Sequence, residues 1–240
     1  SLVFFMGVGD AETGLLTYGT VSEVVPSEKA REITRKLAPA YGTMQFPSLQ
    51  QEIEYEPDAE TIGGLSIDHV RVKQEFDPAA GPFNPQSIMN FLFGPEGMNS
   101  RMAYPQGLQV QTLGGGTELM EQTLKSLDDT SGEHAAADSD AFRATRAQLS
   151  ERANALLLID AAGMVVEGLR LVIESGLLPL PLDESMLEGL DVEESYFGAS
   201  LTSEPSHVRI KVYVPLGQVR GFSKLIRQFE NMAAGPPQQL

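Results

Sequence analysis

The sequence predicts an α+β fold in which antiparallel sheets are built from repeated strand–turn–strand–helix units, with the helices packed on one face. Three observations predict it. Paired segments have apolar residues that alternate with a period of two, turn residues separate the members of each pair, and an apolar stripe at three- and four-residue steps follows each pair. Hairpins followed by helices favour an antiparallel sheet, because a parallel sheet would alternate single strands with helices.

The first of these units opens the chain. Residues 2–8 and 15–25 are expected to be strands joined by a glycine-containing turn. Pro26 then starts a helix, where its missing N–H costs nothing, and Gly42 ends it. The helix carries one apolar stripe, formed by Ala30, Ile33, Leu37 and Tyr41.

The second unit is less regular. Strands are expected over residues 49–55 and 65–76, and a short helix follows that Pro85 opens. Within the second strand the apolar phase slips by one residue. This slip predicts a β-bulge near Asp68 and His69.

A third hairpin is expected over residues 101–113, with Thr117 capping the helix after it. The polar, small residues 128–137 are typical of a linker. We therefore expect an N-terminal half over residues 1–127 and a C-terminal half of similar plan over residues 138–240, with one continuous domain as the alternative. The recurrence of the plan indicates an internal repeat.

In the C-terminal half, a helix is expected over residues 139–149 and a strand over residues 153–159, whose apolar run predicts cover on both faces. Another helix is expected over residues 160–174. The last hairpin, 196–202 with 207–214, alternates most cleanly, and its second strand predicts one buried and one wet face. The helix after it carries an apolar stripe formed by Val219, Phe222, Ile226, Phe229 and Ala233.

The composition excludes several classes of protein. The net charge of −16 repels phosphate, and no basic cluster offsets it, so a nucleic-acid partner is not expected. The chain has no cysteine, which excludes disulfides, thiolate catalysis and cysteine-ligated zinc. No apolar run approaches the length of a transmembrane span. Because the chain starts within a strand pattern, we expect that a signal peptide, or a whole upstream region, was removed from an exported protein.

No catalytic or cofactor-binding motif is found, and we expect no catalytic residue. The glycines at 114–116 precede a helix, where anions bind, but no Gly-Lys-Ser/Thr follows, so a flexible turn is favoured. The histidines His69, His134 and His207 are far apart in the sequence, and none belongs to an H-E-x-x-H helix. A G-x-S-x-G elbow is also absent.

Two acidic segments supply the best candidates for metal ligands. The densest set, which Ca²⁺ would accept, is formed by Asp128, Asp129, Glu133, His134, Asp138 and Asp140. Its spacing does not match the EF-hand loop, because Thr130 and Gly132 fall where ligands belong, so a solvated linker is the alternative. The second segment, residues 183–194, is expected on a wet surface, available to a cation or a basic partner. No other cofactor is expected.

A family resemblance is carried by three stretches: LQVQTLGGGTELMEQTLKSL at 108–127, ADSDAFRATRAQLSERANALLLIDAAGMVVEGLRLV at 137–172 and YFGASLTSEPSHVRIKVYVP at 196–215. In this order they resemble uncharacterised exported proteins of planctomycete bacteria, and they are loosely similar to a bacterial envelope domain of unknown function. The resemblance implies a protein with a signal peptide, located in the periplasm or on the cell surface. It supplies no functional residues.

These observations lead to three hypotheses for function. The first is a non-enzymatic exported protein that binds or scaffolds in the cell envelope, with a hydrophobic ligand under its helices or a protein partner at a sheet edge. The second is a hydrolase that uses carboxylates or a metal. The third is a calcium-dependent structural module. The absence of motifs favours the first.

Overall fold

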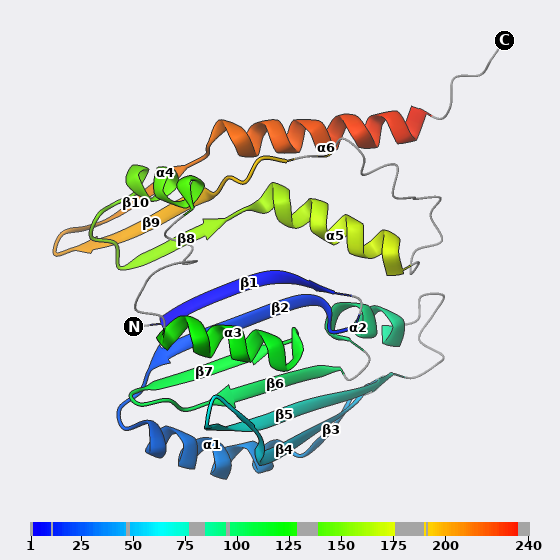
Figure 1. Ribbon diagram of the computed structural model, residues 1–240, viewed down its shortest axis with the longest axis vertical. Helices are drawn as coiled ribbons and strands as arrows, with labels where there is room; N and C mark the ends of the chain where they lie inside the picture. Colours follow the sequence, from blue (N-terminus) through cyan, green and yellow to red (C-terminus); the bar gives the residue numbers. More distant parts are fainter. Residues whose placement is uncertain are drawn as a thin grey trace. The chain divides into compact units, whose positions relative to one another are not determined.

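A computed structural model shows that the chain forms two compact units (Figure 1). Unit 1 comprises Ser1–Asp128 and Ser175–Leu177, and unit 2 comprises Asp129–Glu174 and Leu178–Leu240. The structure describes residues 2–10, 12–46, 49–76, 85–94, 97–128, 139–175, 190 and 192–234. The predicted α+β class is confirmed, since helices accompany two sheets in which neighbouring strands are antiparallel.

Unit 1 contains one sheet with the strand order β1-β2-β7-β6-β5-β4-β3. Its strands are β1 (Leu2–Asp10), β2 (Gly14–Glu23), β3 (Thr43–Phe46), β4 (Leu49–Ile62), β5 (Leu65–Phe76), β6 (Met98–Ala103) and β7 (Leu108–Leu113). Its helices are α1 (Ser27–Tyr41), α2 (Pro85–Phe93) and α3 (Gly116–Asp128). Three hairpin–helix units, β1-β2-α1, β4-β5-α2 and β6-β7-α3, follow one another as the sequence predicts, whereas β3 has no counterpart in the prediction.

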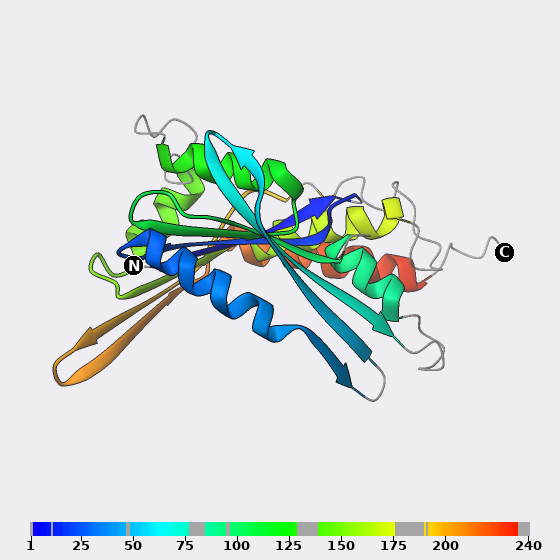
Figure 2. The ribbon, with the colours of Figure 1, turned by 90° about the horizontal axis from the view of Figure 1, so that it is seen from below.

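Helices lie on both faces of this sheet, which differs from the expected placement on one face. Neighbouring residues of a strand point to opposite faces. Ile67 of β5 packs in a cluster with Met120 of α3, whereas Asp68 accepts a hydrogen bond from Arg31 of α1. Figure 2 shows α1 and α3 on either side of the strands. The physical reason is that the second face carries the buried carboxylate of Asp68, which is paired with Arg31 of α1.

The apolar core of unit 1 lies beneath α3. Its buried members are Ile62, Ile67, Ala103, Val110, Met120 and Leu124. Across the strands, Ile67 lies opposite Ala103, and Ala103 lies opposite Val110. Burial of each large apolar side chain in such a row stabilises the fold by about 1.5–3 kcal/mol.

The bulge lies on β4, across from its predicted position near Asp68 and His69. The register between β4 and β5 shifts between Glu56 and Glu60. Asp58, inside the bulge, has a φ of 56°, and its backbone N–H donates to the Asp68 carboxylate at 3.0 Å. The phase slip in β5 therefore marks the bulge, but the extra residues belong to the partner strand.

Unit 2 contains a smaller sheet with the strand order β10-β9-β8. Its elements are α4 (Asp140–Gln148), β8 (Ala155–Ile159), α5 (Ala161–Ser175), β9 (Phe197–Glu204), β10 (His207–Tyr213) and α6 (Leu216–Ala234). The expected cover of β8 on both faces is wrong, because Leu156 and Leu157 are 42% and 47% exposed. The physical reason is that β8 is an edge strand of a sheet with few helices against it.

One face of the small sheet is covered by α4. Ser139 caps this helix by accepting a hydrogen bond from the backbone N–H of Phe142 at 3.3 Å. Thr145 is buried and donates to the carbonyl of Tyr196 at 3.0 Å, and an added Cβ on Gly198 would meet Thr145 Cγ2 at 2.6 Å. The helix therefore packs directly on the backbone of β9.

The other helices of unit 2 pack against each other. Val166 of α5 and Leu225 of α6 form a buried cluster with Leu190. Gln218 of α6 is also buried, and its Nε2 donates to Asp160 Oδ1 at 2.8 Å and to the carbonyl of Ser195 at 2.5 Å. None of the described helices is both long and apolar enough to span a lipid bilayer.

Candidate functional site

The first candidate is the buried carboxylate of Asp68 in unit 1. It accepts hydrogen bonds from Arg31 Nη2 at 2.6 Å, from the Tyr55 hydroxyl at 2.5 Å and from the backbone N–H of Asp58 at 3.0 Å. Burial alone would raise the pKa of Asp68, but these hydrogen bonds outweigh it and hold the pKa well below its usual range. Every acceptor position is used, so Asp68 anchors α1 to the sheet and is not available for chemistry.

This anchor overrides the predicted orientation of α1. Ile33 and Leu37 of the apolar stripe are 47% and 54% exposed. Arg31 and Arg35 instead point toward the sheet, where both contact Asp68. A buried carboxylate demands a paired cation, and this demand exceeds the gain from burying two aliphatic side chains.

The second candidate is His69, on the opposite face of β5. Its Nε2 lies 2.8 Å from Glu60 Oε1, and Arg101 Nε donates to the same oxygen at 2.8 Å. The Thr117 hydroxyl of α3 donates to Glu60 Oε2 at 3.2 Å instead of capping the helix as predicted. Burial would raise the pKa of Glu60, but the hydrogen bonds from His69 and Arg101 lower it.

The His69 cluster links three strands to one helix. It joins β4, β5, β6 and the start of α3 through one carboxylate. His69 Nδ1 is buried without a hydrogen-bond partner among the described residues. The glycines at 114–116 before α3 have φ values of 69°, 62° and 59°, which is the conformation that the turn interpretation requires.

The predicted calcium ligands are only partly described. Asp128 ends α3 and Asp140 begins α4, where its carboxylate accepts a hydrogen bond from Arg143 at 2.7 Å. The other members of the set, Asp129, Glu133, His134 and Asp138, lie outside the described residues. Among the residues that the structure describes, no group of three or more acidic or histidine side chains is arranged to hold a metal ion. The calcium hypothesis stays a prediction.

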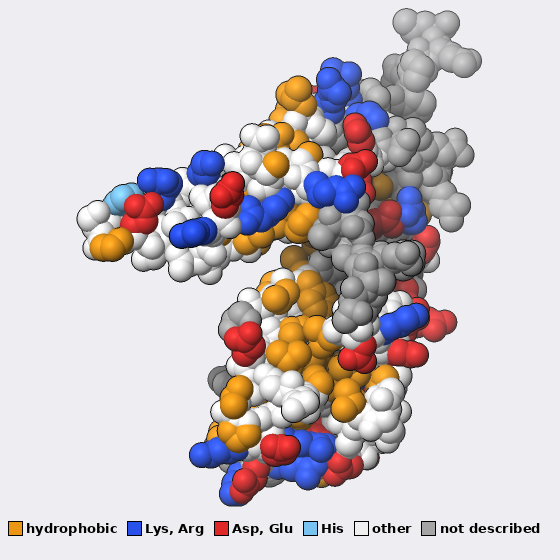
Figure 3. Space-filling model, turned by 60° about the vertical axis from the view of Figure 1, so that its left-hand side comes forward, with side chains coloured by type: hydrophobic (Ala, Val, Ile, Leu, Met, Phe, Trp, Pro, Cys, Tyr) orange, Lys and Arg blue, Asp and Glu red, His pale blue; other side chains and the backbone are white. Residues whose placement is uncertain are grey.

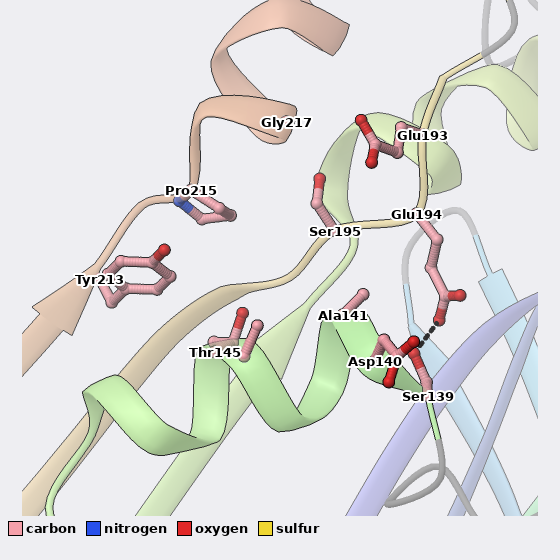
Figure 4. A pocket seen from close by; sticks show the side chains of 11 residues that line it. Ser139, Asp140, Ala141, Thr145, Glu193, Glu194, Ser195, Tyr213, Pro215 and Gly217 are labelled. Carbon is pink, nitrogen blue, oxygen red and sulfur yellow. Dashed lines mark hydrogen bonds between the residues drawn. The ribbon is translucent and has the colours of Figure 1, made fainter.

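The third candidate is an acidic groove in unit 2 of about 600 Å³ (Figure 4). The residues that line it are Ser139, Asp140, Ala141, Ala144, Thr145, Glu193, Glu194, Ser195, Tyr213, Pro215 and Gly217. Two members of the predicted acidic surface segment, Glu193 and Glu194, thus meet the start of α4. Glu194 Oε1 accepts hydrogen bonds from the Ser139 hydroxyl at 3.0 Å and from Tyr196 at 2.7 Å. Burial and the bond to Glu194 raise the pKa of Tyr196 to about 12.

The chemistry of this groove is limited by its lining. Among the described residues that line it, none is a histidine, lysine or arginine, and Ser139 donates to a carboxylate. The same serine caps α4. These contacts orient the end of the helix, and they do not form a nucleophile with a general base of the usual kind.

The fourth candidate is an uncovered aliphatic surface on the sheet of unit 2. We define the apolar sheet surface as Leu157 of β8, Leu201 of β9, and Val208, Ile210 and Val212 of β10. Their exposed fractions are 47%, 36%, 59%, 66% and 60%. They share one face, since Ile210 lies opposite Leu201, while Val212 and Leu157 both lie opposite Ala199.

The opposite face of the hairpin is polar. His207, Arg209 and Lys211 alternate with the aliphatic residues of β10 and so point away from the apolar sheet surface. In Figure 3, Lys and Arg side chains gather over this part of unit 2, and hydrophobic side chains border them. The predicted alternation is present, but the expected burial of the apolar face of β10 is wrong. Within unit 2, α4 covers the polar side of the sheet and no described element covers the other.

α6 also exposes apolar side chains. The predicted stripe residues Val219, Phe222, Ile226 and Phe229 are 50%, 40%, 57% and 45% exposed. The helix instead buries Gln218 and Leu225 against its neighbours. The expected core position of this stripe is therefore wrong, because the helix turns its Gln218 side toward Asp160 and Ser195.

Comparisons of the chain with protein-family models, with curated proteins and with solved structures gave no match.

Proposed function

We propose that the protein is a non-catalytic binding module that docks another protein on the apolar sheet surface of unit 2. This proposal rests on β10, whose sequence alternates like that of a half-buried strand although its aliphatic side chains are exposed. The strand has the strict alternation of a half-buried strand, yet its aliphatic side chains are 59–66% exposed. An exposed aliphatic face of this kind marks an interaction surface.

The shape of the surface favours a protein over a small ligand. Small molecules bind in concave sites that enclose most of their area. Neither groove described in unit 2 includes any of the five residues of the apolar sheet surface. A flat face beside a free strand suits a partner that contributes a strand or a helix of its own.

The edge of β10 adds a second element of recognition. This strand is the outer member of its sheet, so its outward N–H and C=O groups have no strand beside them among the described residues. An added strand would meet Arg209 and Lys211 on one face and the aliphatic residues on the other. A partner whose residues alternate between aliphatic and acidic fits both faces. We place this partner in the cell envelope, which is the location that the resemblance to exported bacterial proteins implies.

The proposal is tested by site-specific photo-cross-linking in the producing cell. A photoreactive benzoylphenylalanine at Ile210 is expected to give one discrete heterologous adduct, which mass spectrometry identifies. Ile33, an exposed isoleucine of unit 1, serves as the matched control. The adduct at Ile210 should disappear when Val212→Lys is added.

Two results would overturn the proposal. One is the absence of a discrete adduct at Ile210, or equal yields at Ile210 and Ile33. The other is a measurable hydrolytic turnover of the purified chain that survives Val212→Lys and is lost with Glu194→Gln, which would favour the hydrolase hypothesis instead.

A further inference from the structure

The first strand of unit 1 has an unprotected edge. β1 is the outer strand of its sheet, with β2 on one side and no strand beside it on the other among the described residues. From Leu2 to Gly9 it contains no charged residue and no proline. Leu2, Phe4 and Met6 point to one face and are 68%, 57% and 49% exposed.

The other described edge strands carry the protection that β1 lacks. Natural sheets avoid unwanted pairing by making edge strands short or by placing charges on them. β3 has 4 residues and β8 has 5, while Arg209 and Lys211 on β10 disfavour pairing with a second copy and leave that edge to an acidic strand. β1 has 9 residues and is uncharged up to Asp10. The simplest explanation for a long, uncharged edge strand is that another strand pairs with it.

We propose that β1 pairs antiparallel with β1 of a second copy of this chain and joins two unit 1 sheets into one. A two-fold axis through Phe5, perpendicular to the sheet, places Leu2 opposite Val8 of the second copy and Phe4 opposite Met6. In this register every apolar residue meets an uncharged residue, and Asp10 lies outside the paired segment. The arrangement uses both β1 edges, so the assembly closes at two copies.

The side chains of β1 support a second copy as the occupant. A perpendicular two-fold axis keeps each face of the sheet continuous, so Leu2, Phe4 and Met6 of both copies share one face. Phe4 already packs against Tyr18, with ring centroids 5.9 Å apart, and gains Met6 of the second copy as a cross-strand neighbour. The same operation on β10 would place Arg209 opposite Lys211, a like-charge pair that destabilises the contact. Self-pairing thus suits β1 and does not suit β10.

The oligomeric state of the whole chain tests the proposal. Sedimentation equilibrium should show a dimer for the unmodified protein. Phe4→Lys should weaken the dimer at least about tenfold, because each lysine then lies opposite Met6 of the other copy and diagonal to the second lysine. Ile210→Lys, at a position of similar exposure in unit 2, should leave the dimer unchanged. Circular dichroism and thermal melting verify that both variants fold.

A cysteine test reports the strand contact directly, since the chain has no cysteine of its own. A mixture of Phe4→Cys and Met6→Cys chains should form a mixed disulfide under mild oxidation, and a mixture of Ile210→Cys and Val212→Cys chains should not. A monomeric protein at tens of micromolar, a dimer unaffected by Phe4→Lys, or open-ended oligomers would overturn the proposal. So would a heterologous adduct at β1 on a monomeric chain. The adduct at Ile210 should persist in Phe4→Lys, so this proposal and the proposed function fail separately.

Discussion

Units 1 and 2 both contain hairpins followed by helices, but their sheets are covered differently. In unit 1, β5 lies between α1 and α3, and its residues Ile67, Asp68 and His69 are all buried. In unit 2, α4 covers one face of the sheet, and β10 is exposed from His207 to Val212. Alternation in a strand determines which residues share a face of the sheet. Whether that face is buried depends on where helices pack, which the sequence of the strand does not specify.

The largest loss of stability is expected from a substitution in the sheet of unit 1, which has helices on both faces. Asp68→Ala removes the acceptor of Arg31, Tyr55 and the Asp58 N–H at once and leaves them partly buried without their partner. Loss of one member of a buried ion pair costs about 3–5 kcal/mol, and because Arg31 keeps some exposure we expect about 3 kcal/mol. Urea unfolding followed by circular dichroism measures the loss, and hydrogen exchange should localise it to β4, β5 and α1.

The control for this variant is on the same helix. Lys36→Ala removes a pair with Glu32 in which both side chains are well exposed. It should change the free energy of unfolding by less than about 0.5 kcal/mol. Equal losses in Asp68→Ala and Lys36→Ala would show that the Asp68 network is not the anchor of α1.

A smaller effect is expected from acid, which protonates the same group. Hydrogen bonds to the Asp68 carboxylate hold its pKa below the unfolded value of about 3.9. Asp68 therefore stabilises the fold fully above about pH 5, and this contribution falls as the pH drops below the unfolded pKa. The difference in unfolding free energy between the unmodified chain and Asp68→Asn should narrow from pH 7 to pH 3. A difference that stays constant over this range would contradict the role of the charge.

The element order was largely predictable, because turns and hydrophobic spacing are local signals. Each hairpin–helix unit of the sequence has a counterpart in the structure, and the glycines at 114–116 adopt the turn geometry expected of them. The short strand β3 escaped prediction, since four residues carry too little periodicity. The fold class follows from these local signals alone.

The orientation and the cover of the elements were less predictable. The apolar stripe of α1 predicts that Ile33 and Leu37 face the sheet. In the structure Arg31 and Arg35 face it instead, because the buried Asp68 of β5 requires a cation. The sequence of α1 alone gives no sign of this contact, because Asp68 belongs to β5. The slip of the apolar phase at Asp68 was the available signal.

The candidate site shows the same limit. The alternation of Val208, Ile210 and Val212 predicted an apolar face, and that face exists. Its exposure depends on where α4, α5 and α6 pack, which is a property of the folded chain. The predicted calcium ligands do not share one strand, so no alternation places them on a common face. The two that are described, Asp128 and Asp140, belong to different helices.

The smallest expected effect tests how tightly the covered face of the unit 2 sheet is packed. Gly198→Ala places a methyl group 2.6 Å from Thr145 Cγ2 and 3.0 Å from Leu149 Cδ1, so α4 must move away from β9. Overpacking of this kind costs about 1–3 kcal/mol, and we expect the lower end because the obstructing atoms are side-chain termini. Adding Thr145→Ser removes Cγ2, retains a hydroxyl for the carbonyl of Tyr196, and should recover part of the loss in thermal melting. If Gly198→Ala is neutral, α4 is not fixed on the sheet, and the two faces of this sheet differ less in cover than the structure shows.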